Sequence, residues 1–578
     1  MLANELAPLA DLLDPGAYPH PVDQVEGLIT HISQIFLAGD YAYKLKRPVS
    51  LGFVDFSTLG RRRFYCEEEL RLNRRLAPQL YLDVVPVVRV RNQVRMNAEG
   101  EVIDYAVRMR RFEQRLLLSQ QPLNGVLIDR LAERVARFHA SLSPAPPDTP
   151  YGDPSAVLAP MLDNFPPLQA ALAVSGDADI RRRLQRLERW TRKRFACLRP
   201  VIEQRRRDGF IRECHGDMHR GNIVVLDEQP LIFDCLEFNS SLRWIDTMSE
   251  VAFLTMDLAE SGASSYARRF LNRYLEVTGD YAGLRLLRFY QVYRALVRAK
   301  VCAIQLMQAD PAQAIETERP SPPSASPTLD AGAPSPVPGG SSGLSARAAL
   351  LHYLALAQTC TGRHRPKLFI THGLSGSGKT WIGNLLREHL PIIQIRSDIE
   401  RKRLCGIAPQ GHPSAQQVPQ QAAQQIAQQI AQLYSADASE RTYARLLALA
   451  RELIEAGFSV LVDATFLQRR QRARFRALAQ TLNCPHRILV MQAPMHLLRE
   501  RISARSLVGG DASDADIDVL SLQIANREPL TDAEHPTAVF LNSEAPMQIE
   551  AVLAHVAGDQ GRGASELSSL STASHATS

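Results

Sequence analysis

The chain has 578 residues, of which 45% are hydrophobic and 22% are charged, and its formal net charge is +6. This length exceeds what one ordinary hydrophobic core accommodates, so we expect two or more globular domains. The small net charge does not favour nucleic acid as the main partner. The sequence has neither an apolar stretch that could span a bilayer nor a signal-peptide pattern, so we expect no membrane partner.

The eight cysteines include no C-x-x-C pair, so the spacing typical of a zinc site is absent. They are scattered through apolar or mixed segments, as expected for reduced thiols. We therefore expect a cytoplasmic protein. Cys214 and Cys235 flank candidate active-site residues, and we interpret them as small core residues.

The first part of the chain has the pattern of a small β-rich lobe followed by a larger helical lobe. Residues 32–46 predict a β-hairpin, and residues 64–76 predict an amphipathic helix. Further strands are expected at 84–90 and 105–109. The remaining pattern is mostly helical and is interrupted at 211–234.

Changes in composition divide the chain. Residues 316–346 are rich in Pro, Ser, Ala and Gly, which predicts a disordered linker between a first domain at 1–315 and a second at 347–556. Within the second domain, Gln and Ala are abundant at 409–433 and predict a polar helix. Residues 557–578 predict a disordered tail.

The second domain alternates strand and helix patterns. Short apolar strands are expected at 367–370, 392–395, 460–462 and 487–491, with helices between them. This alternation predicts a parallel sheet with helices on both faces.

A first candidate site lies in the segment HGDMHRGN at residues 215–222, which is followed by Asp234 at the end of an apolar run. Asp217 and Asn222 have the spacing of a protein-kinase catalytic loop. In that chemistry the aspartate accepts or orients the proton of the acceptor hydroxyl. We predict Asp217 as the catalytic base and Asn222 and Asp234 as Mg²⁺ ligands.

The segment HGDMHRGNI resembles the HGDxHxxN loop of aminoglycoside phosphotransferases and related small-molecule kinases, over residues 25–310. The resemblance implies a lysine on the third strand that is paired with a glutamate on the following helix. Lys44 and Lys46 share one face of the expected strand because side chains alternate. We favour Lys44, paired with Glu69, as the contact to the ATP phosphates. The alternative is that the glutamates at 67–69 merely favour the helix N-terminus.

The sequence departs from a protein kinase at the loop that covers the phosphates. No G-x-G-x-x-G precedes Lys44, and the glycines nearest to it upstream are Gly27 and Gly39. The covering loop is therefore expected to be short or differently built, and a ligand-sensing first domain is the alternative to a catalytic one. Asp246 and His139 resemble structural positions of such folds and are left out of the catalytic set.

The second candidate site is a complete P-loop, G-x-x-x-x-G-K-T. It comprises Gly373, Leu374, Ser375, Gly376, Ser377, Gly378, Lys379 and Thr380. Backbone N–H groups of such a loop cradle the phosphates of ATP, Lys379 reaches the terminal phosphates, and Thr380 binds Mg²⁺. Asp463 ends another expected strand and is predicted as a second metal ligand.

The surroundings of the P-loop favour phosphoryl transfer to a substrate. Ala464 follows Asp463, where motors of the AAA+ class usually have a water-activating glutamate. Asp398 follows a strand and is predicted as the general base for the acceptor hydroxyl. Arg501 and Arg505 share one helix face and are predicted to clamp the transferring phosphoryl group, with ordinary surface charges as the alternative.

These motifs resemble the P-loop kinase-like ATPases related to gluconate kinase, polynucleotide kinase and zeta-type toxins, over residues 365–555. The whole chain resembles bacterial fusion proteins that join an aminoglycoside phosphotransferase-like domain to a P-loop ATP-binding domain of the AAA family. The resemblance implies an α+β protein-kinase-like fold followed by an α/β P-loop NTPase fold.

We therefore expect an ATP- and Mg²⁺-dependent phosphotransferase that acts on hydroxyl groups of small molecules. A regulatory ATP-binding protein with one non-catalytic domain is the alternative. A nucleic-acid end kinase is disfavoured by the modest charge and the lack of interleaved aromatic residues. The sequence specifies neither the acceptor nor the oligomeric state.

Overall fold

The computed structural model describes residues 7–51, 54–175, 178–308, 346–362, 364–407, 435–508, 517–544, 552–554 and 556. The chain divides into two compact units. The first comprises residues 1–274 and 283–362, and the second comprises residues 275–282 and 363–578. The expected linker up to residue 345, the Gln- and Ala-rich helix and the tail lie outside the described residues. Within the described ranges, no helix has both the length and the apolar character needed to cross a bilayer.

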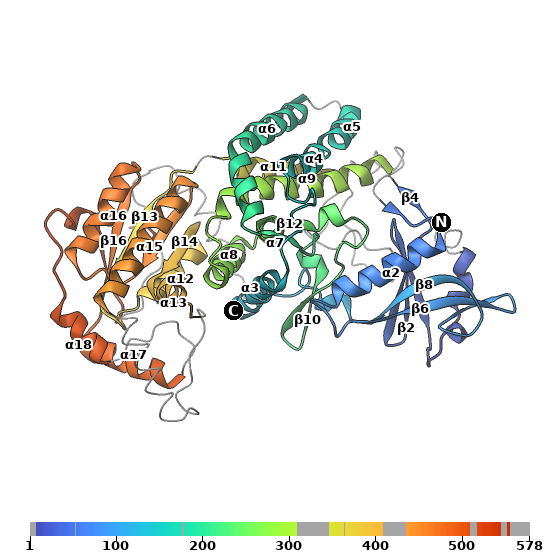
Figure 1. Ribbon diagram of the computed structural model, residues 1–578, viewed down its shortest axis with the longest axis horizontal. Helices are drawn as coiled ribbons and strands as arrows, with labels where there is room; N and C mark the ends of the chain where they lie inside the picture. Colours follow the sequence, from blue (N-terminus) through green and yellow to red (C-terminus); the bar gives the residue numbers. More distant parts are fainter. Residues whose placement is uncertain are drawn as a thin grey trace, which may run out of the picture. The chain divides into compact units, whose positions relative to one another are not determined.

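The first unit begins with a six-stranded antiparallel sheet (Figure 1) in the order β1-β2-β3-β8-β6-β7. The strands are β1 (Val25–Ile29), β2 (Ser33–Ala38), β3 (Tyr41–Lys46), β6 (Tyr81–Val90), β7 (Gln93–Met96) and β8 (Glu101–Arg110). The short pair β4 (Ser50–Leu51) and β5 (Val54–Asp55) precedes helix α2 (Leu59–Asn73), which packs on the sheet. The hairpin expected at 32–46 is confirmed as β2 and β3, and the expected helix begins earlier than predicted.

The remainder of the first unit is helical, as expected. Its helices are α3 (Gly125–Ser141), α4 (Pro154–Leu162), α5 (Phe165–Ser175), α6 (Ala178–Arg207), α7 (Thr247–Glu260), α8 (Ser264–Thr278), α9 (Leu284–Gln308) and α11 (Ala346–Cys360), and the end of α8 from Leu275 is assigned to the second unit. Between α6 and α7 lie the short pairs β9 (Ile211–Glu213) with β12 (Trp244–Asp246), and β10 (Ile223–Leu226) with β11 (Gln229–Ile232). Both pairs are antiparallel and frame the segment that carries the first candidate site.

Helix α11 belongs to the first unit, although the sequence places it at the start of the second domain. Leu350 and Leu354 of α11 are buried in one core cluster with Val292 and Leu296 of α9 and Phe253 of α7. Figure 1 shows α11 alongside α9. The division between the units therefore falls at residue 362 rather than at the expected start at 347.

The second unit contains a five-stranded parallel sheet in the order β14-β15-β13-β16-β17. Its strands are β13 (Leu368–His372), β14 (Ile392–Arg396), β15 (Ser459–Asp463), β16 (His486–Gln492) and β17 (Ala538–Asn542). Its helices are α12 (Lys379–His389), α13 (Ser397–Leu404), α15 (Ala436–Glu455), α16 (Arg469–Thr481), α17 (Met495–Val508) and α18 (Ile517–Ala525). The parallel sheet is confirmed, and the edge strand β17 is an addition to the expected strands.

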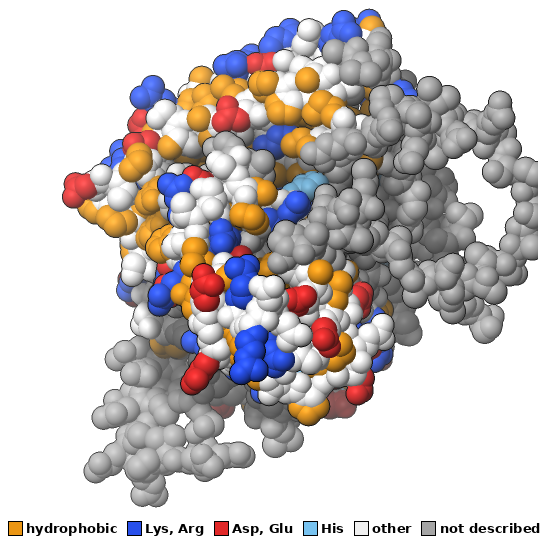
Figure 2. All heavy atoms as spheres, turned by 90° about the vertical axis from the view of Figure 1, so that its right-hand side faces the viewer, with side chains coloured by type: hydrophobic (Ala, Val, Ile, Leu, Met, Phe, Trp, Pro, Cys, Tyr) orange, Lys and Arg blue, Asp and Glu red, His pale blue; other side chains and the backbone are white. Residues whose placement is uncertain are grey.

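The face of the molecule in Figure 2 is the side on which the first unit's sheet lies in Figure 1. Lys and Arg side chains alternate there with Asp and Glu side chains and with apolar ones. Interspersed charges of both signs are those of an ordinary solvated surface. This surface agrees with the small net charge of the chain.

Candidate phosphate-handling sites

The segment between β9 and β10 brings Asp217 and Asn222 together. The amide nitrogen Nδ2 of Asn222 lies 3.1 Å from Oδ2 of Asp217 and 3.0 Å from its carbonyl oxygen. Because that nitrogen is used by Asp217, the side-chain oxygen of Asn222 is the atom left to act as a metal ligand. The five-residue spacing thus lets one side chain both orient the carboxylate and offer an oxygen ligand.

Two histidines flank Asp217 and hold the loop through defined tautomers. The N–H of Asp217 donates to Nδ1 of His215 at 3.2 Å, so Nε2 carries the proton and donates to the carbonyl of Phe233 at 2.8 Å. The N–H of Gly221 likewise donates to Nδ1 of His219, which places Nε2 3.5 Å from Oδ2 of Asp217. Burial lowers the pKa of His215, which keeps its ring neutral.

Asp217 is held in its ionised form. Burial opposes ionisation, but the interactions of Asp217 with His219 and Arg298 outweigh it and lower the pKa of Asp217 below its ordinary value. An ionised carboxylate is a hydrogen-bond acceptor only, which is the state needed to receive or orient a hydroxyl proton.

The lysine–glutamate pair expected in the first unit is present, and both candidate lysines take part in it. Lys44 Nζ lies 2.9 Å from Oε1 of Glu69 and 2.5 Å from Oδ1 of Asp234. Lys46 contacts the other oxygen of Glu69 and also Glu237. Lys44 is the lysine beside the candidate metal ligand Asp234, whereas Lys46 is fully buried with its two carboxylates. This division of contacts favours Lys44 as the phosphate contact.

Asp234 adopts a backbone conformation that is uncommon for its residue type. Its φ is 63°, in the left-handed region, and its N–H donates to the hydroxyl of Tyr81 at 3.2 Å. Non-glycine residues in this region are infrequent and are concentrated at functional sites. The side chain is 43% exposed, so the carboxylate is accessible to a ligand.

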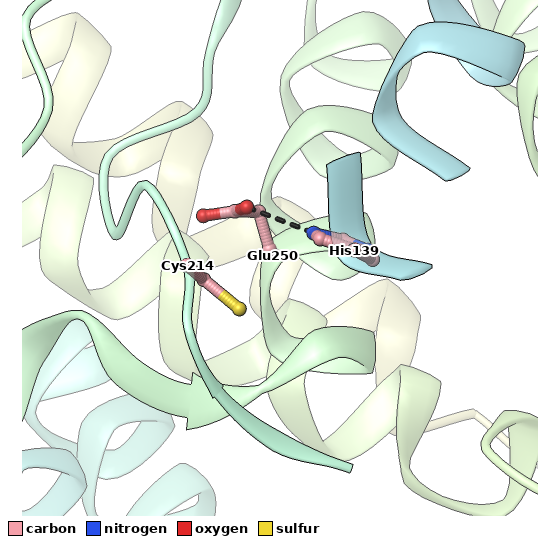
Figure 3. Close-up of side chains that lie close together, drawn as sticks. All are labelled: His139, Cys214 and Glu250. Atoms are coloured by element: carbon pink, nitrogen blue, oxygen red, sulfur yellow. Dashed lines mark hydrogen bonds and ion pairs between the residues drawn. The ribbon is translucent and has the colours of Figure 1, made fainter. Parts of the chain in front are cut away.

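Buried side chains that the sequence analysis did not connect form a hydrogen-bond network with the catalytic loop (Figure 3). Glu250 of α7 accepts the N–H of Gly216 at 2.7 Å and contacts Nε2 of His139 at 2.9 Å. Gly216 has a φ of 88°, and a Cβ there would lie 2.9 Å from the carbonyl of Leu242. The loop therefore needs glycine at this position. In the sequence, the only trace of this network is a histidine on one helix and a glutamate at the start of another. No local pattern shows that His139 and Glu250 pair with each other.

Cys214 completes a cluster with His139 and Glu250 whose ligand-type atoms lie within 4.8 Å of one another. Burial raises the pKa of the Cys214 thiol well above its usual value, so it remains protonated. Burial opposes ionisation of Glu250, but His139 and the Gly216 amide outweigh it and lower the pKa of Glu250 to about 2. In this structure His139 and Glu250 are paired with each other, and the thiol of Cys214 donates to the carbonyl of Ile245 at 3.7 Å, so the three side chains hold the surrounding segments together.

The P-loop connects β13 to α12, as predicted. Gly376 has a φ of 80°, and a Cβ there would lie 2.9 Å from the carbonyl of Leu498, so this turn requires glycine. The hydroxyl of Ser377 is buried without a hydrogen-bond partner among the described residues. Nζ of Lys379 donates to the carbonyl of Leu374 at 2.8 Å, which folds the lysine over the loop. A backbone cradle with a buried orphan hydroxyl and a lysine across it fits a chain of phosphates.

The two predicted metal ligands of the second unit are adjacent. The hydroxyl of Thr380 donates to Oδ2 of Asp463 at 2.9 Å, and Nε2 of Gln394 donates to the same oxygen at 3.1 Å. Burial raises the pKa of Asp463 despite the opposing charges of Arg396 and Lys379. A hydroxyl and a carboxylate are oxygen ligands of the kind that Mg²⁺ prefers, and a bound cation would stabilise the ionised form of Asp463. The residues therefore fit a magnesium ion.

A cavity of about 500 Å³ opens in front of the P-loop and includes Lys379, Thr380, Asp398, Asp463 and Arg501 in its lining. Asp398 is paired with Arg401, whose NH1 lies 3.1 Å from Oδ1 of the aspartate. Arg501 donates to the carbonyl of Gly376 at 3.2 Å and to Ser543 at 2.8 Å. The side chain of Arg505 lies outside what the structure describes. Asp398 and Lys379 thus face one space, and Arg501 braces the loop in this structure.

Gln523 of α18 is a P-loop contact that the sequence did not reveal. Its side-chain oxygen accepts the N–H of Ser375 at 2.8 Å, and its nitrogen donates to the hydroxyl of the same serine at 2.9 Å. The N–H and the hydroxyl oxygen of Ser375 are therefore both bonded to one glutamine. The contact spans 148 residues of sequence, which explains why no local pattern pointed to it.

Two family models match the chain, in the order in which the two sites occur. Residues 56–287 match the phosphotransferase enzyme family. Residues 368–530 match a model described as an AAA domain. The chain joins a phosphotransferase-family domain to an AAA-type P-loop domain. This result confirms the resemblance inferred from the two motifs, and it supports a phosphotransferase.

Relatives of this two-domain protein extend over nearly its full length. An uncharacterised protein of Mycobacterium tuberculosis (strain H37Rv) is 28% identical over 528 residues, which cover 89% of this chain and 93% of that protein. An uncharacterised protein of Mycobacterium bovis matches to the same extent. The two domains therefore occur together, in the same order, in other proteins.

Two solved structures are each similar to part of this chain. A choline/ethanolamine kinase family protein from Mesorhizobium loti is 14% identical, with a TM-score of 0.34, and covers 62% of this chain and 95% of that one. A gluconokinase from Sinorhizobium meliloti is 19% identical, with a TM-score of 0.23, and covers 37% of this chain and 100% of that one.

Proposed function

We propose that this protein is an ATP- and Mg²⁺-dependent phosphotransferase that phosphorylates hydroxyl groups of small molecules, with one site in each domain. The observation that carries the proposal is the assembly of the first site. Lys44 pairs with Asp234 and Asp217 pairs with Asn222, and the N–H of Phe233, next to Asp234, donates to the carbonyl of Asn222. These contacts bring together the kinds of residue that phosphoryl transfer uses. The complete P-loop with Thr380 and Asp463 supports the same class of chemistry in the second domain.

In the first site Asp217 would receive the proton of the acceptor hydroxyl. The hydroxyl oxygen forms a bond to the terminal phosphorus of ATP, the bond between that phosphorus and the bridging oxygen breaks, and ADP leaves. Lys44 would contact the phosphates while Glu69 fixes its position. Asn222 and Asp234 would hold Mg²⁺, which neutralises phosphate charge when bound.

In the second site the P-loop amides and Lys379 would bind the phosphates, and Thr380 and Asp463 would hold the metal. Asp398 would meet the acceptor hydroxyl across the cavity. Its ion pair with Arg401, at 3.1 Å, fixes the position of the carboxylate.

The proposal is tested by incubating the full chain with Mg²⁺, γ-labelled ATP and a metabolite extract. Asp217→Asn and Lys379→Met variants are compared with the exposed-surface controls Asp208→Asn and Lys193→Met. We expect labelled small molecules that are lost in one active-site variant and retained in both controls. Label that appears only as free phosphate in every sample would contradict phosphoryl transfer and favour a regulatory ATPase.

A further inference from the structure

The backbone on both sides of Gly216 is held by side chains from outside the catalytic loop. Its N–H donates to Glu250 of α7 at 2.7 Å, and its carbonyl oxygen accepts NH1 of Arg294, from α9, at 2.9 Å. That carbonyl belongs to the peptide group that joins Gly216 to Asp217. Glu250 therefore fixes the peptide group before Gly216, and Arg294 fixes the one that leads to the proposed catalytic base.

The second of these peptide groups controls where the carboxylate of Asp217 lies. Gly216 has no β-carbon, so its own backbone angles restrict the following peptide group less than those of another residue would. A rotation of that group would move the side chain of Asp217. A general base must lie within hydrogen-bond reach of the proton it receives, so the hydrogen bond from Arg294 bears directly on this requirement.

Arg294 is a buried cation whose contacts are with neutral groups. The residue is 5% exposed. Besides the carbonyl of Gly216, its guanidinium donates to the hydroxyl of Ser249 at 3.3 Å and lies 4.8 Å from the centre of the Phe253 ring. In the part of the chain that the structure describes, no carboxylate pairs with it, and its Nε has no hydrogen-bond partner.

This arrangement differs from that of other buried arginines in the first unit. Arg205 and Arg220 pair with aspartates at 2.7 Å and 3.1 Å. A buried cation without a carboxylate costs free energy of folding, so the packing of α9 alone does not explain Arg294. What the charge provides is a stronger hydrogen bond to the Gly216 carbonyl, because a charged donor binds an acceptor more tightly than a neutral one.

We propose that Arg294 is a positioning residue of the first site, which holds the peptide group between Gly216 and Asp217 so that the carboxylate meets the acceptor hydroxyl. The inference rests on the proposed function of the first site and adds to it a residue that contacts neither ATP nor the acceptor. Its loss should affect the transfer step more than ATP binding, because Lys44 keeps its own contact with Glu69.

The first test measures transfer in the full chain carrying Lys379→Met, which removes the P-loop lysine of the second site. Arg294→Met keeps an unbranched side chain but removes every donor. At saturating Mg·ATP, formation of labelled product from a metabolite extract should slow by about tenfold to a hundredfold, the value of one hydrogen bond to a charged group. The half-saturating ATP concentration should stay close to that of the parent. Arg294→Lys retains a charged donor and should recover most of the rate.

The matched control is Leu296→Ala, which weakens the same helix without touching the loop. Leu296 lies two residues further along α9 and is buried in the core cluster that α9 shares with α11. Its truncation should lower the free energy of unfolding by about 2–5 kcal/mol. Below its unfolding transition, which thermal unfolding locates, this variant should transfer at the rate of the parent.

The second test does not depend on activity. Hydrogen exchange is followed by mass spectrometry in peptides that cover residues 214–222 of the same variants. Arg294→Met should speed exchange in these peptides by about tenfold or more, because the loop opens locally when the contact is lost. Leu296→Ala and Arg294→Lys should leave exchange in these peptides near that of the parent.

Equal transfer rates in Arg294→Met and Leu296→Ala would overturn the positioning role, and so would equal exchange in residues 214–222 of these two variants. An Arg294→Lys variant as slow as Arg294→Met would overturn the role of the charged donor. If the parent forms no Asp217-dependent product, the proposed function of the first site fails, and the exchange comparison still decides whether Arg294 holds the loop.

Discussion

The two proposed phosphate sites are built in different ways. The first is built from side chains brought together by ion pairs between distant segments, such as Lys44 with Glu69 and Asp234. The second is built mainly from consecutive backbone groups of one loop, braced by single side chains such as Arg501. A site of the first kind depends on the packing of its whole domain, whereas a site of the second kind is largely specified by local sequence.

The largest effect is expected from Asp217→Asn. The substitution keeps the shape of the side chain but removes its ability to take a proton. First-site transfer should fall by about 10² to 10⁴-fold, with unchanged thermal unfolding and unchanged second-site transfer. Initial rates with labelled ATP measure this effect, with Asp208→Asn as control. A loss of less than tenfold would show that Asp217 is not the base.

Substitution of Lys46 should mainly lower the free energy of unfolding, whereas substitution of Lys44 should mainly lower transfer activity. Lys46→Met leaves Glu69 and Glu237 without their shared buried cation, so the free energy of unfolding should fall by about 3–5 kcal/mol. Lys44→Met should lower transfer activity with a smaller loss of stability, because Glu69 retains Lys46. Urea unfolding and initial rates on both variants check this prediction. Equal destabilisation by both substitutions would remove the distinction between them.

The second unit should lose stability in acid through buried histidines. Burial lowers the pKa of His372 to about 4, and that of His486 to about 4, from an ordinary 6.5. Between pH 6.5 and 4 the unfolded state therefore binds more protons than the folded state. The contribution of each neutral histidine to the free energy of unfolding is fully present above pH 6.5 and is lost as the pH falls towards 4. The loss is on the order of 3 kcal/mol for each histidine at most.

Trp381 can report this transition in a Trp190→Phe/Trp244→Phe background, since the chain has three tryptophans. His372→Asn, which keeps a donor for the carbonyl of Phe466, should remove about half of the pH dependence of the unfolding midpoint. The exposed His389→Asn is the control. An unchanged slope in His372→Asn would contradict the prediction.

The smallest effect concerns the contact between Gln523 and the P-loop. ATP phosphates that use the Ser375 amide must displace the side-chain oxygen of Gln523. Gln523→Leu should therefore tighten Mg·ATP binding about threefold to tenfold, the value of one or two neutral hydrogen bonds. Titration calorimetry with a slowly hydrolysed ATP analogue measures it, with Gln480→Leu as a control remote from the cavity. Weaker binding would instead indicate that Gln523 contacts the nucleotide.

The sequence predicts most of what is local. Most strands of both sheets, the catalytic-loop spacing and the P-loop follow from short-range patterns, because hydrophobic periodicity and loop motifs act over a few residues. The strands β1, β7 and β17 are not predicted. The choice between Lys44 and Lys46 is different, since both occupy one face of β3 and only the position of Asp234 distinguishes them.

What the sequence does not reveal depends on long-range packing. The support of Gly216 by Glu250 and His139 joins three segments, and Gln523 reaches Ser375 across 148 residues. Helix α11 follows the Pro-rich segment and would be expected to open the next domain, yet its apolar face is buried against α9. Partner choice of this kind is a property of the folded structure, which a single sequence does not encode in any local pattern.

The placement of α11 in the first unit changes how the Pro-rich segment, predicted as the linker between the two domains, is interpreted. The helices on either side of it, α9 and α11, pack together in the first unit, so the connection between the two units comes after α11. A protease cut between residues 308 and 346 should thus give two bands on a denaturing gel but one particle of unchanged mass in solution. The covalent path that carries the chain from the first unit to the P-loop starts only after Cys360.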